Sequence, residues 1–219
     1  MHVGILGGTG PAGSALAARL ASVGIEVTIG SRSKERAQEA CTAICDKFPD
    51  LDLPLRAGDN PMAADCEVVV VATPWDAAAA TAASVSDYLD DKVVICMANA
   101  LVKVGNEFQP LVPPRGSVAA HVQSEVPKAR VAAAFHHLPA HALMKLGTPV
   151  ESDVLICSDH PSATEVTATI VDCIPALRPL DAGSLSNAAP IEAITAVLLQ
   201  LNVRYKARAA IRMTGITLP

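Results

Sequence analysis

Short runs of apolar residues alternate along the chain with longer stretches in which apolar residues recur every three or four positions. The runs have the length of buried strands, and the stretches between them are typical of amphipathic helices. The clearest run, Glu67–Ala72, is almost continuous in valine, as a strand covered on both faces should be. The pattern predicts an α/β fold with strands at Val3–Leu6, Glu26–Gly30, Leu53–Ala57, Glu67–Ala72, Lys92–Met97, Arg130–Phe135, Asp153–Ser158 and Leu177–Leu180.

Helical patterns fill the intervals between these strands. A last helix follows a turn at Asp181–Asn187. Residues 102–117 hold three prolines and two glycines, and we expect a loop or lid there. We therefore divide the chain into a domain of residues 1–180 and a helical C-terminal segment of residues 181–219. The other helices are expected after Gly13 and at Lys34–Lys47, Asn60–Ala64, Trp75–Tyr88, Ser117–Glu125 and residues 161–173.

A glycine-rich turn joins the first strand to the first helix. Its glycines at positions 8, 10 and 13 have the spacing of the dinucleotide-binding fingerprint, in the strand–turn–helix context that this fingerprint requires. They permit a tight turn, close approach of a pyrophosphate and close helix packing, and the helix start binds the phosphates. We predict a Rossmann-type, doubly wound and mainly parallel sheet. The residues expected against the dinucleotide are Gly7, Gly8, Thr9, Gly10, Pro11 and Ala12.

The end of the second strand carries a hydroxyl and basic side chains rather than an acid. An NAD-binding domain usually has Asp or Glu here, which accepts a hydrogen bond from the ribose 2′-OH. This chain has Ser31 and Arg32, then Lys34 and Arg36 in a first helical turn, where the helix dipole disfavours cations. A 2′-phosphate offsets that cost and accepts charge-assisted hydrogen bonds from Arg32. We therefore predict NADP as the dinucleotide, with a solvated basic turn as the alternative.

Two further strand ends lie at the carboxyl edge of the predicted sheet, which faces the ligand crevice in this fold. Thr73, Pro74 and Trp75 follow the valine run. The tryptophan either walls the nicotinamide side of the crevice or packs at the start of the next helix. His136 and His137 follow the strand at 130–135 and either donate to a substrate oxygen or bond to the backbone.

The third histidine nearby, His141, raises the question of a metal site. His137 and His141 are four residues apart, but no carboxylate lies between them and Pro139 disfavours a helix that carries both. Ligand spacing alone does not make a metal site. We expect none.

Composition sets the class of protein. Of the 219 residues, 51% are hydrophobic and 3% aromatic, which suits helices built on Ala, Val, Leu and Ile against a buried parallel sheet. The net charge of −5 gives no general attraction to nucleic acid. No leader, membrane span or Cys-x-x-Cys motif is recognisable, and the six scattered cysteines are expected to be reduced. We expect a cytoplasmic protein without a membrane partner.

The last helix is apolar over much of its surface and basic at its end. Its apolar stripe includes Ile191 and Leu198, and we expect a partner subunit or the cleft to cover it, which suggests a homodimer. Arg204, Arg208 and Arg212 share a helix face at intervals of four. They either anchor an anionic substrate tail or interact favourably with the negative end of the helix dipole at the helix C-terminus.

Several motifs together resemble the NADPH-dependent coenzyme F420 reductases, also called F420H2:NADP oxidoreductases. The similarity covers essentially the whole chain, and Asn202–Ala207 resembles the bacterial, especially the actinobacterial, branch. The later motifs are far more specific than the glycine turn. The motifs are Gly7–Gly10, Gly30–Arg32, Thr73–Trp75, Phe135–Ala140 and Leu177–Asn187.

The resemblance implies hydride transfer between C4 of the nicotinamide and C5 of the deazaflavin ring of coenzyme F420. It implies two rings stacked in a cleft between the Rossmann part and the C-terminal helices, with Lys145 or the 204–212 face near the anionic tail. It places Thr9 to Ala12 on the pyrophosphate. The residues that the resemblance places on the 2′-phosphate are Ser31, Arg32 and Arg36. Those that it places on the deazaflavin are His136 and Thr195. The further cofactor-binding residues are Thr73, Pro74, Asn99, Leu138 and Ala140.

This chemistry needs no covalent nucleophile, because the cofactors react and the protein supplies orientation and electrostatics. Two other functions remain possible on the sequence alone. One is an NADP-dependent reductase of a small imine, carbonyl or flavin, although about 35 residues after the last strand are too few for the usual helical second domain. The other is a non-catalytic NADP sensor.

Overall fold

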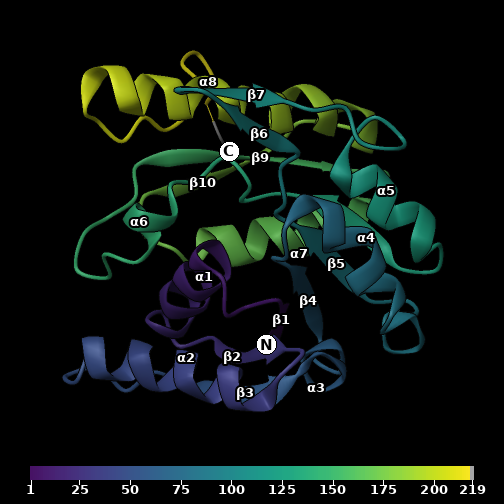
Figure 1. Ribbon diagram of the computed structural model, residues 1–219, viewed down its shortest axis with the longest axis vertical. Helices are drawn as coiled ribbons and strands as arrows, with labels where there is room; N and C mark the ends of the chain where they lie inside the picture. Colours follow the sequence, from purple (N-terminus) through teal and green to yellow (C-terminus); the bar gives the residue numbers. More distant parts are fainter. Residues whose placement is uncertain (218–219) are drawn as a thin grey trace.

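The computed structural model describes residues 1–217, which form one layer of β-sheet between two layers of helices (Figure 1). The sheet has eight strands in the order β10-β9-β8-β5-β4-β1-β2-β3. All neighbours run parallel except β8 and β9, which are antiparallel. The predicted doubly wound, mainly parallel sheet is confirmed. The strands are β1 (His2–Leu6), β2 (Glu26–Ser31), β3 (Leu55–Asp59), β4 (Val68–Val71), β5 (Val93–Cys96), β8 (Arg130–Ala133), β9 (Ser152–Ser158) and β10 (Leu177–Asp181).

The helices divide between the two faces of this sheet. The central strand β4 shows why: Val68 and Val70 belong to one buried apolar cluster, and Val69 and Val71 belong to the other. The first cluster includes α1 (Pro11–Ala21), α2 (Lys34–Lys47) and α7 (Pro161–Asp172). The second includes α3 (Asn60–Ala64), α4 (Trp75–Ala83) and α5 (Val118–Glu125). A valine run without polar alternation thus lies between two helical layers.

The segment after β5 differs from the prediction. We expected a loop at residues 102–117, but β6 (Leu101–Val104) and β7 (Glu107–Pro110) form an antiparallel hairpin. Gly105 adopts φ +60° at its turn, which glycine does without strain. The hairpin lies beside the last helix, α8 (Ala188–Tyr205), at one end of the molecule (Figure 1). Short one-turn elements complete the list: α6 (Ala140–Leu143) and 3-10 turns at Ser86–Tyr88 and Leu185–Asn187.

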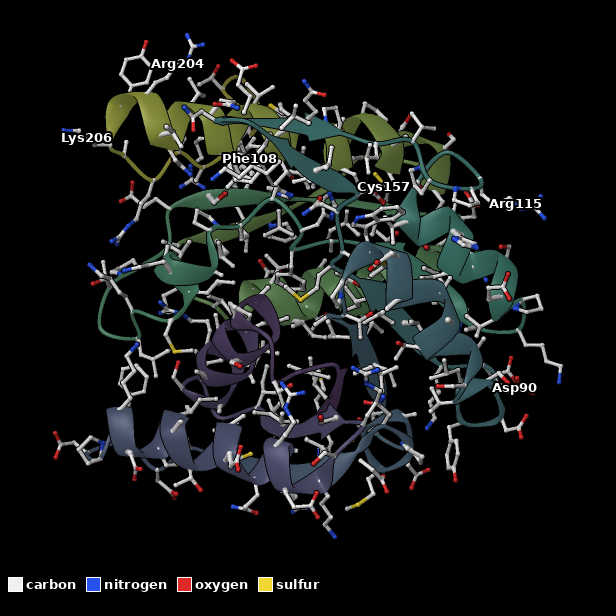
Figure 2. All side chains as sticks on the ribbon, in the orientation of Figure 1. Asp90, Phe108, Arg115, Cys157, Arg204 and Lys206 are labelled. Atoms are coloured by element: carbon white, nitrogen blue, oxygen red, sulfur yellow. The ribbon has the colours of Figure 1, made fainter. Side chains whose placement is uncertain are left out.

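The end of α8 overturns one prediction. Lys206 adopts the left-handed conformation, with φ 49° and ψ 39°, so the helix ends at Tyr205. Arg208 and Arg212 therefore lie beyond the helix and share no face with Arg204. Figure 2 shows Arg204 and Lys206 directed away from the body of the molecule.

The apolar stripe of α8 is only partly covered. Leu198 is buried, whereas Ile194, Val197, Leu201 and Tyr205 are exposed. The buried face instead includes two polar residues, Glu192 and Thr195. Within the described part of the chain, no helix is long and apolar enough to cross a membrane.

Candidate functional site

The glycine turn is built from backbone contacts. The Gly8 N–H donates to the carbonyls of Ile5 at 3.2 Å and Gly30 at 3.0 Å, which ties the turn to β1 and β2. Gly7 adopts φ +68°, and a Cβ there would lie 2.4 Å from Cγ2 of Thr73. A Cβ on Gly13 would lie 2.8 Å from the Gly8 Cα. These positions require glycine because the helix start and the β4 end approach the turn so closely.

The start of α1 is open to an anion. Gly10 is its N-cap residue, Pro11 occupies its first turn, and no side chain caps it. The N–H groups of a first helical turn have no partners within the helix. They and the helix dipole therefore favour a negatively charged group such as a pyrophosphate.

A cavity of about 300 Å³ extends from this turn toward α2. It brings together the glycine turn and the predicted 2′-phosphate residues at the end of β2. Among the described residues, no carboxylate lies within salt-bridge distance of Arg32 or Arg36, so both cations are available to an anion. The cavity is lined by Gly7, Thr9, Gly10, Ser31, Arg32, Arg36, Asn60, Ala72, Thr73, Pro74, Ala77 and Thr81.

A second cavity, of about 340 Å³, continues the first across the carboxyl ends of β4 and β5. The two share Gly10 and Ala72–Pro74, so together they form one cleft along the edge of the sheet. Trp75 lines this second part and also packs against the apolar cluster beneath α4, which fits both interpretations of that residue. The lining is Gly10, Pro11, Ala12, Ala72, Thr73, Pro74, Trp75, Met97, Ala98, Asn99 and Leu101.

Asn99 connects three elements at the far end of the cleft. Its Nδ2 donates to the carbonyl of His136 at 2.6 Å, and its Oδ1 accepts from the Thr195 hydroxyl at 3.3 Å. The residue thereby joins the end of β5, the segment after β8 and α8. Thr195 is 9% exposed and lines neither part of the cleft, so its hydroxyl acts on the cleft through Asn99.

The two histidines after β8 are buried and close together, with ring centroids 5.1 Å apart. Burial, with the neighbouring His137, lowers the pKa of His136 to about 3, and neither of its ring nitrogens has a hydrogen-bond partner. His137 Nε2 lies 2.9 Å from the Asp153 carbonyl, and burial lowers its pKa as well. Both rings are therefore neutral near pH 7. His137 matches the backbone-bonded alternative, whereas His136 has two unused nitrogens.

Leu138 and Ala140, which follow these histidines, have different surroundings. Leu138 is buried in the core. Ala140 lines a third cavity, of about 290 Å³, together with His141 and Met144. Pro11 lines both this cavity and the second one, so the two adjoin at the start of α1. Gly8, His136, Leu138 and Thr195 are thus the predicted site residues that line none of these three cavities.

Two buried acids were not predicted. Glu192 on α8 accepts hydrogen bonds from the backbone N–H groups of Val118 at 2.9 Å and Ala119 at 3.2 Å, at the start of α5. Burial raises the pKa of Glu192 to about 7. The sequence did contain a signal for Glu192, because an acid on the apolar stretch of a helix is buried and then needs hydrogen-bond donors from another element.

Asp153, the second acid, is fully buried on β9. It accepts from Arg178 at 2.7 Å through both carboxylate oxygens and from Arg212 at 3.0 Å. These arginines and the Met213 N–H hold the pKa of Asp153 at about 2, against its burial. Arg212 is thus engaged with Asp153, while Arg208 lies 3.1 Å from His141 and Arg204 lies 3.9 Å from Glu107. The predicted shared basic face does not exist.

The chain resembles characterised proteins over both parts of this cleft. Residues 2–100 match the family described as NADP oxidoreductase, coenzyme F420-dependent. The chain is 36% identical to the F420-dependent NADP reductase of Methanothermobacter thermautotrophicus, covering 99% of this chain and 96% of that protein. It is 33% identical to the corresponding Methanocaldococcus jannaschii protein, covering 99% of each. A crystal structure of a proposed F420-dependent NADP reductase from Arthrobacter sp. FB24 has the same fold, with a TM-score of 0.82 at 22% identity over 97% of this chain and 98% of that one.

Proposed function

The chain belongs to the family of F420-dependent NADP reductases, and on that premise we propose that its cleft transfers a hydride between NADP(H) and coenzyme F420. In the direction of deazaflavin reduction, the C4 hydride of NADPH forms the new C–H bond at C5 of the deazaflavin, which also takes up one proton. The products are NADP⁺ and reduced coenzyme F420. The protein contributes no electrons, and its task is to bind and align the two ring systems.

The observation that carries this proposal is the continuous cleft along the carboxyl edge of the sheet. One end has the free Arg32 and Arg36 cations, and the other has Trp75 and Asn99. A dinucleotide that binds the glycine turn by its pyrophosphate extends toward both ends. Its 2′-phosphate then meets the arginines, and its nicotinamide reaches the second cavity. The open space around Gly10, where the nearest atom to an added Cβ is 3.7 Å away, fits a pyrophosphate at the backbone.

The second cavity supports the deazaflavin side of the reaction. At the reaction end, Asn99 bonds to helix α8 and also to the segment that follows β8. We assign it the role of holding these two parts together. The neutral His136 has two unpartnered ring nitrogens, and as neutral imidazole it donates one hydrogen bond and accepts another. With its pKa near 3, it supplies no imidazolium proton at neutral pH. The proton that accompanies the hydride therefore does not come from a His136 imidazolium.

The C-terminal part of the chain also favours the deazaflavin reaction over the reduction of a small imine. In the described chain, the parts after β10 are a short turn that includes Leu185–Asn187, then α8 and the segment that follows it, and α8 packs against the hairpin β6–β7. We propose that residues 181–219 complete the deazaflavin end of the cleft rather than form an imine-binding domain. The exposed apolar residues of α8 further support a homodimer, which light scattering tests directly; a monomer would remove α8 as an interface. The six cysteines are free, which supports a cytoplasmic protein.

Stopped-flow absorbance tests the proposed reaction. Oxidised coenzyme F420 mixed with NADPH and the protein should lose its deazaflavin band, much faster than with NADH. The Arg32→Ala variant should have a kcat/KM with NADPH that is about 30-fold lower, because it loses one charge-assisted hydrogen bond to the 2′-phosphate. Its reaction with NADH should be unchanged. Arg56→Ala, on the exposed Arg56–Glu26 pair, is the matched control and should change neither. NADPH binding without deazaflavin turnover in either direction would exclude the proposal.

A further inference from the structure

Arg19 lies on α1, and its side chain is enclosed by the protein. The residue is only 2% exposed. Within residues 1–217, no carboxylate lies within salt-bridge distance of its guanidinium. All of its hydrogen bonds go to backbone carbonyls of one segment: Nε to Leu143 at 2.9 Å, Nη1 to Leu146 at 3.2 Å, and Nη2 to Ala142 at 3.0 Å, Lys145 at 2.7 Å and Thr148 at 3.2 Å.

The segment 142–148 is wrapped around this cation. It begins in the last residues of α6, whose terminal carbonyls have no partner within the helix. Two of its own turns, Lys145 N–H to Ala142 O at 3.2 Å and Thr148 N–H to Lys145 O at 3.0 Å, direct further carbonyls inward. Only arginine supplies donors in several fixed directions at once, whereas lysine is a compact charge. The segment therefore depends on a side chain more than 120 residues earlier for its conformation.

The five hydrogen bonds from Arg19 to residues 142–148, called the clamp below, connect α1 to the segment that follows β8. The helix that carries Arg19 begins at Pro11, in the glycine turn. Ala140 and His141, just before the clamped segment, and Met144 within it line the third cavity together with Pro11 and Ser14 of α1. That cavity adjoins the second one at Pro11. The contacts of Arg19 thus fix the distance between the helix that faces the pyrophosphate and the segment that follows His136 and His137.

We propose that Arg19 is a positioning residue for the deazaflavin side of the site: it fixes residues 142–148 on α1 and so sets the wall formed by Ala140, His141 and Met144. The proposal rests on the proposed function, because it assigns this wall to the deazaflavin partner. The dinucleotide side is lined by the glycine turn, the ends of β2 and β4, and residues of α2, α3 and α4, and no residue of 142–148 lines it. Loss of the clamp should therefore affect one substrate and spare the other.

The test compares Arg19→Lys and Arg19→Met with Arg56→Met, an exposed arginine on β3 that serves as control. Steady-state kinetics give KM for coenzyme F420, fluorescence titration gives Kd for NADPH, and hydrogen exchange reports on residues 142–148. For Arg19→Lys we expect KM for coenzyme F420 to rise about tenfold, Kd for NADPH to stay within about twofold, and exchange in 142–148 to accelerate. Arg56→Met should change none of the three.

A merely structural role would give a different result. It would lower the melting temperature and raise both constants alike, or accelerate exchange in 142–148 with no change in KM for coenzyme F420. Either result overturns the proposal, and Arg19→Lys keeps the test valid if Arg19→Met does not fold. If the wild-type protein reduces no coenzyme F420, the proposed function fails, and with it the role assigned to the wall. The exchange data then still show whether Arg19 holds the segment.

Discussion

The dinucleotide end of the cleft and its reaction end are held together in different ways. At the dinucleotide end, the side-chain hydrogen bonds at the helix starts are local: Ser33 caps α2 by accepting from Arg36 N–H, and Asp59 caps α3 by accepting from Met62 N–H. At the reaction end, side chains far apart in sequence bond to one another, as Asn99 does with Thr195. The first end is therefore specified by short motifs, and the second by buried polar contacts that form only when the whole chain has folded.

The largest effect that separates the two ends is expected at Asp153. Asp153→Asn keeps the shape of the side chain but leaves Arg178 and Arg212 without their carboxylate. The carboxylate is fully buried, but the Arg178 and Arg212 side chains are 24% and 49% exposed, so their charges stay partly solvated and the loss comes from weakened charge-assisted hydrogen bonds. Urea unfolding should therefore show a loss of about 3 kcal/mol. Hydrogen exchange should accelerate around residues 209–216, whereas NADPH affinity should change less than about twofold.

The exposed pair Asp90–Lys128 provides the matched control. Asp90 lies on the surface (Figure 2), 2.6 Å from Lys128. Asp90→Asn should cost less than about 1 kcal/mol, because exposed pairs are solvated. A similar loss in both variants, or a large loss of NADPH affinity in Asp153→Asn, would contradict the separation of the two ends.

The next largest effect is expected at the dinucleotide end, where a substitution should weaken NADPH binding without changing the stability of the fold. A Cβ on Gly10 meets nothing closer than 3.7 Å, and its φ of −76° suits alanine. Gly10→Ala should therefore leave the free energy of unfolding within about 0.5 kcal/mol. Because the added methyl occupies space next to the pyrophosphate, Kd for NADPH should rise roughly 100-fold, equivalent to about 2.7 kcal/mol.

Gly13→Ala serves as the contrasting variant. Its Cβ would lie 2.8 Å from the Gly8 Cα, so this change should destabilise the fold itself. Calorimetry together with NADPH titration distinguishes the two variants. Equal destabilisation of both would show that Gly10 is needed for the turn rather than for the ligand.

The last effect concerns the pH dependence of stability through Glu192, and it is the smallest when taken per pH unit. Burial raises its pKa from the usual 4.5 to about 7, so between these values the folded protein keeps a proton that the unfolded chain has lost. The resulting stabilisation is complete below pH 4.5 and is lost as pH rises to about 7. Relative to Glu192→Gln, the wild type should lose up to about 1.4 kcal/mol per pH unit in this window.

His136 acts in the opposite direction. Its pKa falls from 6.5 to about 3, so its contribution is present above pH 6.5 and is lost as pH falls toward 3. Both proteins carry this histidine, and its effect cancels in the difference between them. Urea unfolding at several pH values gives that difference, and parallel curves for the two proteins would show that Glu192 does not titrate in this range.

Most of the fold was predictable because its signals are local. The predicted bounds of α2 and α3 match the structure, since each helix starts at a capping residue. The hairpin β6–β7 was missed because its strands are only four residues long and largely exposed, and because β7 ends in a proline and packs against the distant helix α8. The end of α8 was missed because Lys206, an unusual residue for the left-handed conformation, terminates it.

The candidate site shows the same division. The sequence predicted the glycine turn, Ser31, Arg32 and Arg36 as site residues, because backbone geometry and charge select them, and in the structure they border one cavity. Arg19, Asp153 and Glu192 were not, although each is a charged residue inside an apolar stretch. Their partners lie 25 to 129 residues away, and no periodicity along the chain indicates such distances.

The contact between Asp153 and the C-terminal segment also has a consequence for how the chain is made. Strand β8 pairs with β9 only at the C-terminal end of β9, opposite Ala132 and Ala133. At the N-terminal end of β9, the Asp153 N–H instead donates to the carbonyl of Ile211 at 2.7 Å. Until the ribosome has added Ile211, the edge of β9 that faces away from β10 remains unpaired in that part. Unpaired edges attract other strands. Nascent or truncated chains that lack this segment should therefore be the forms that depend most on chaperones.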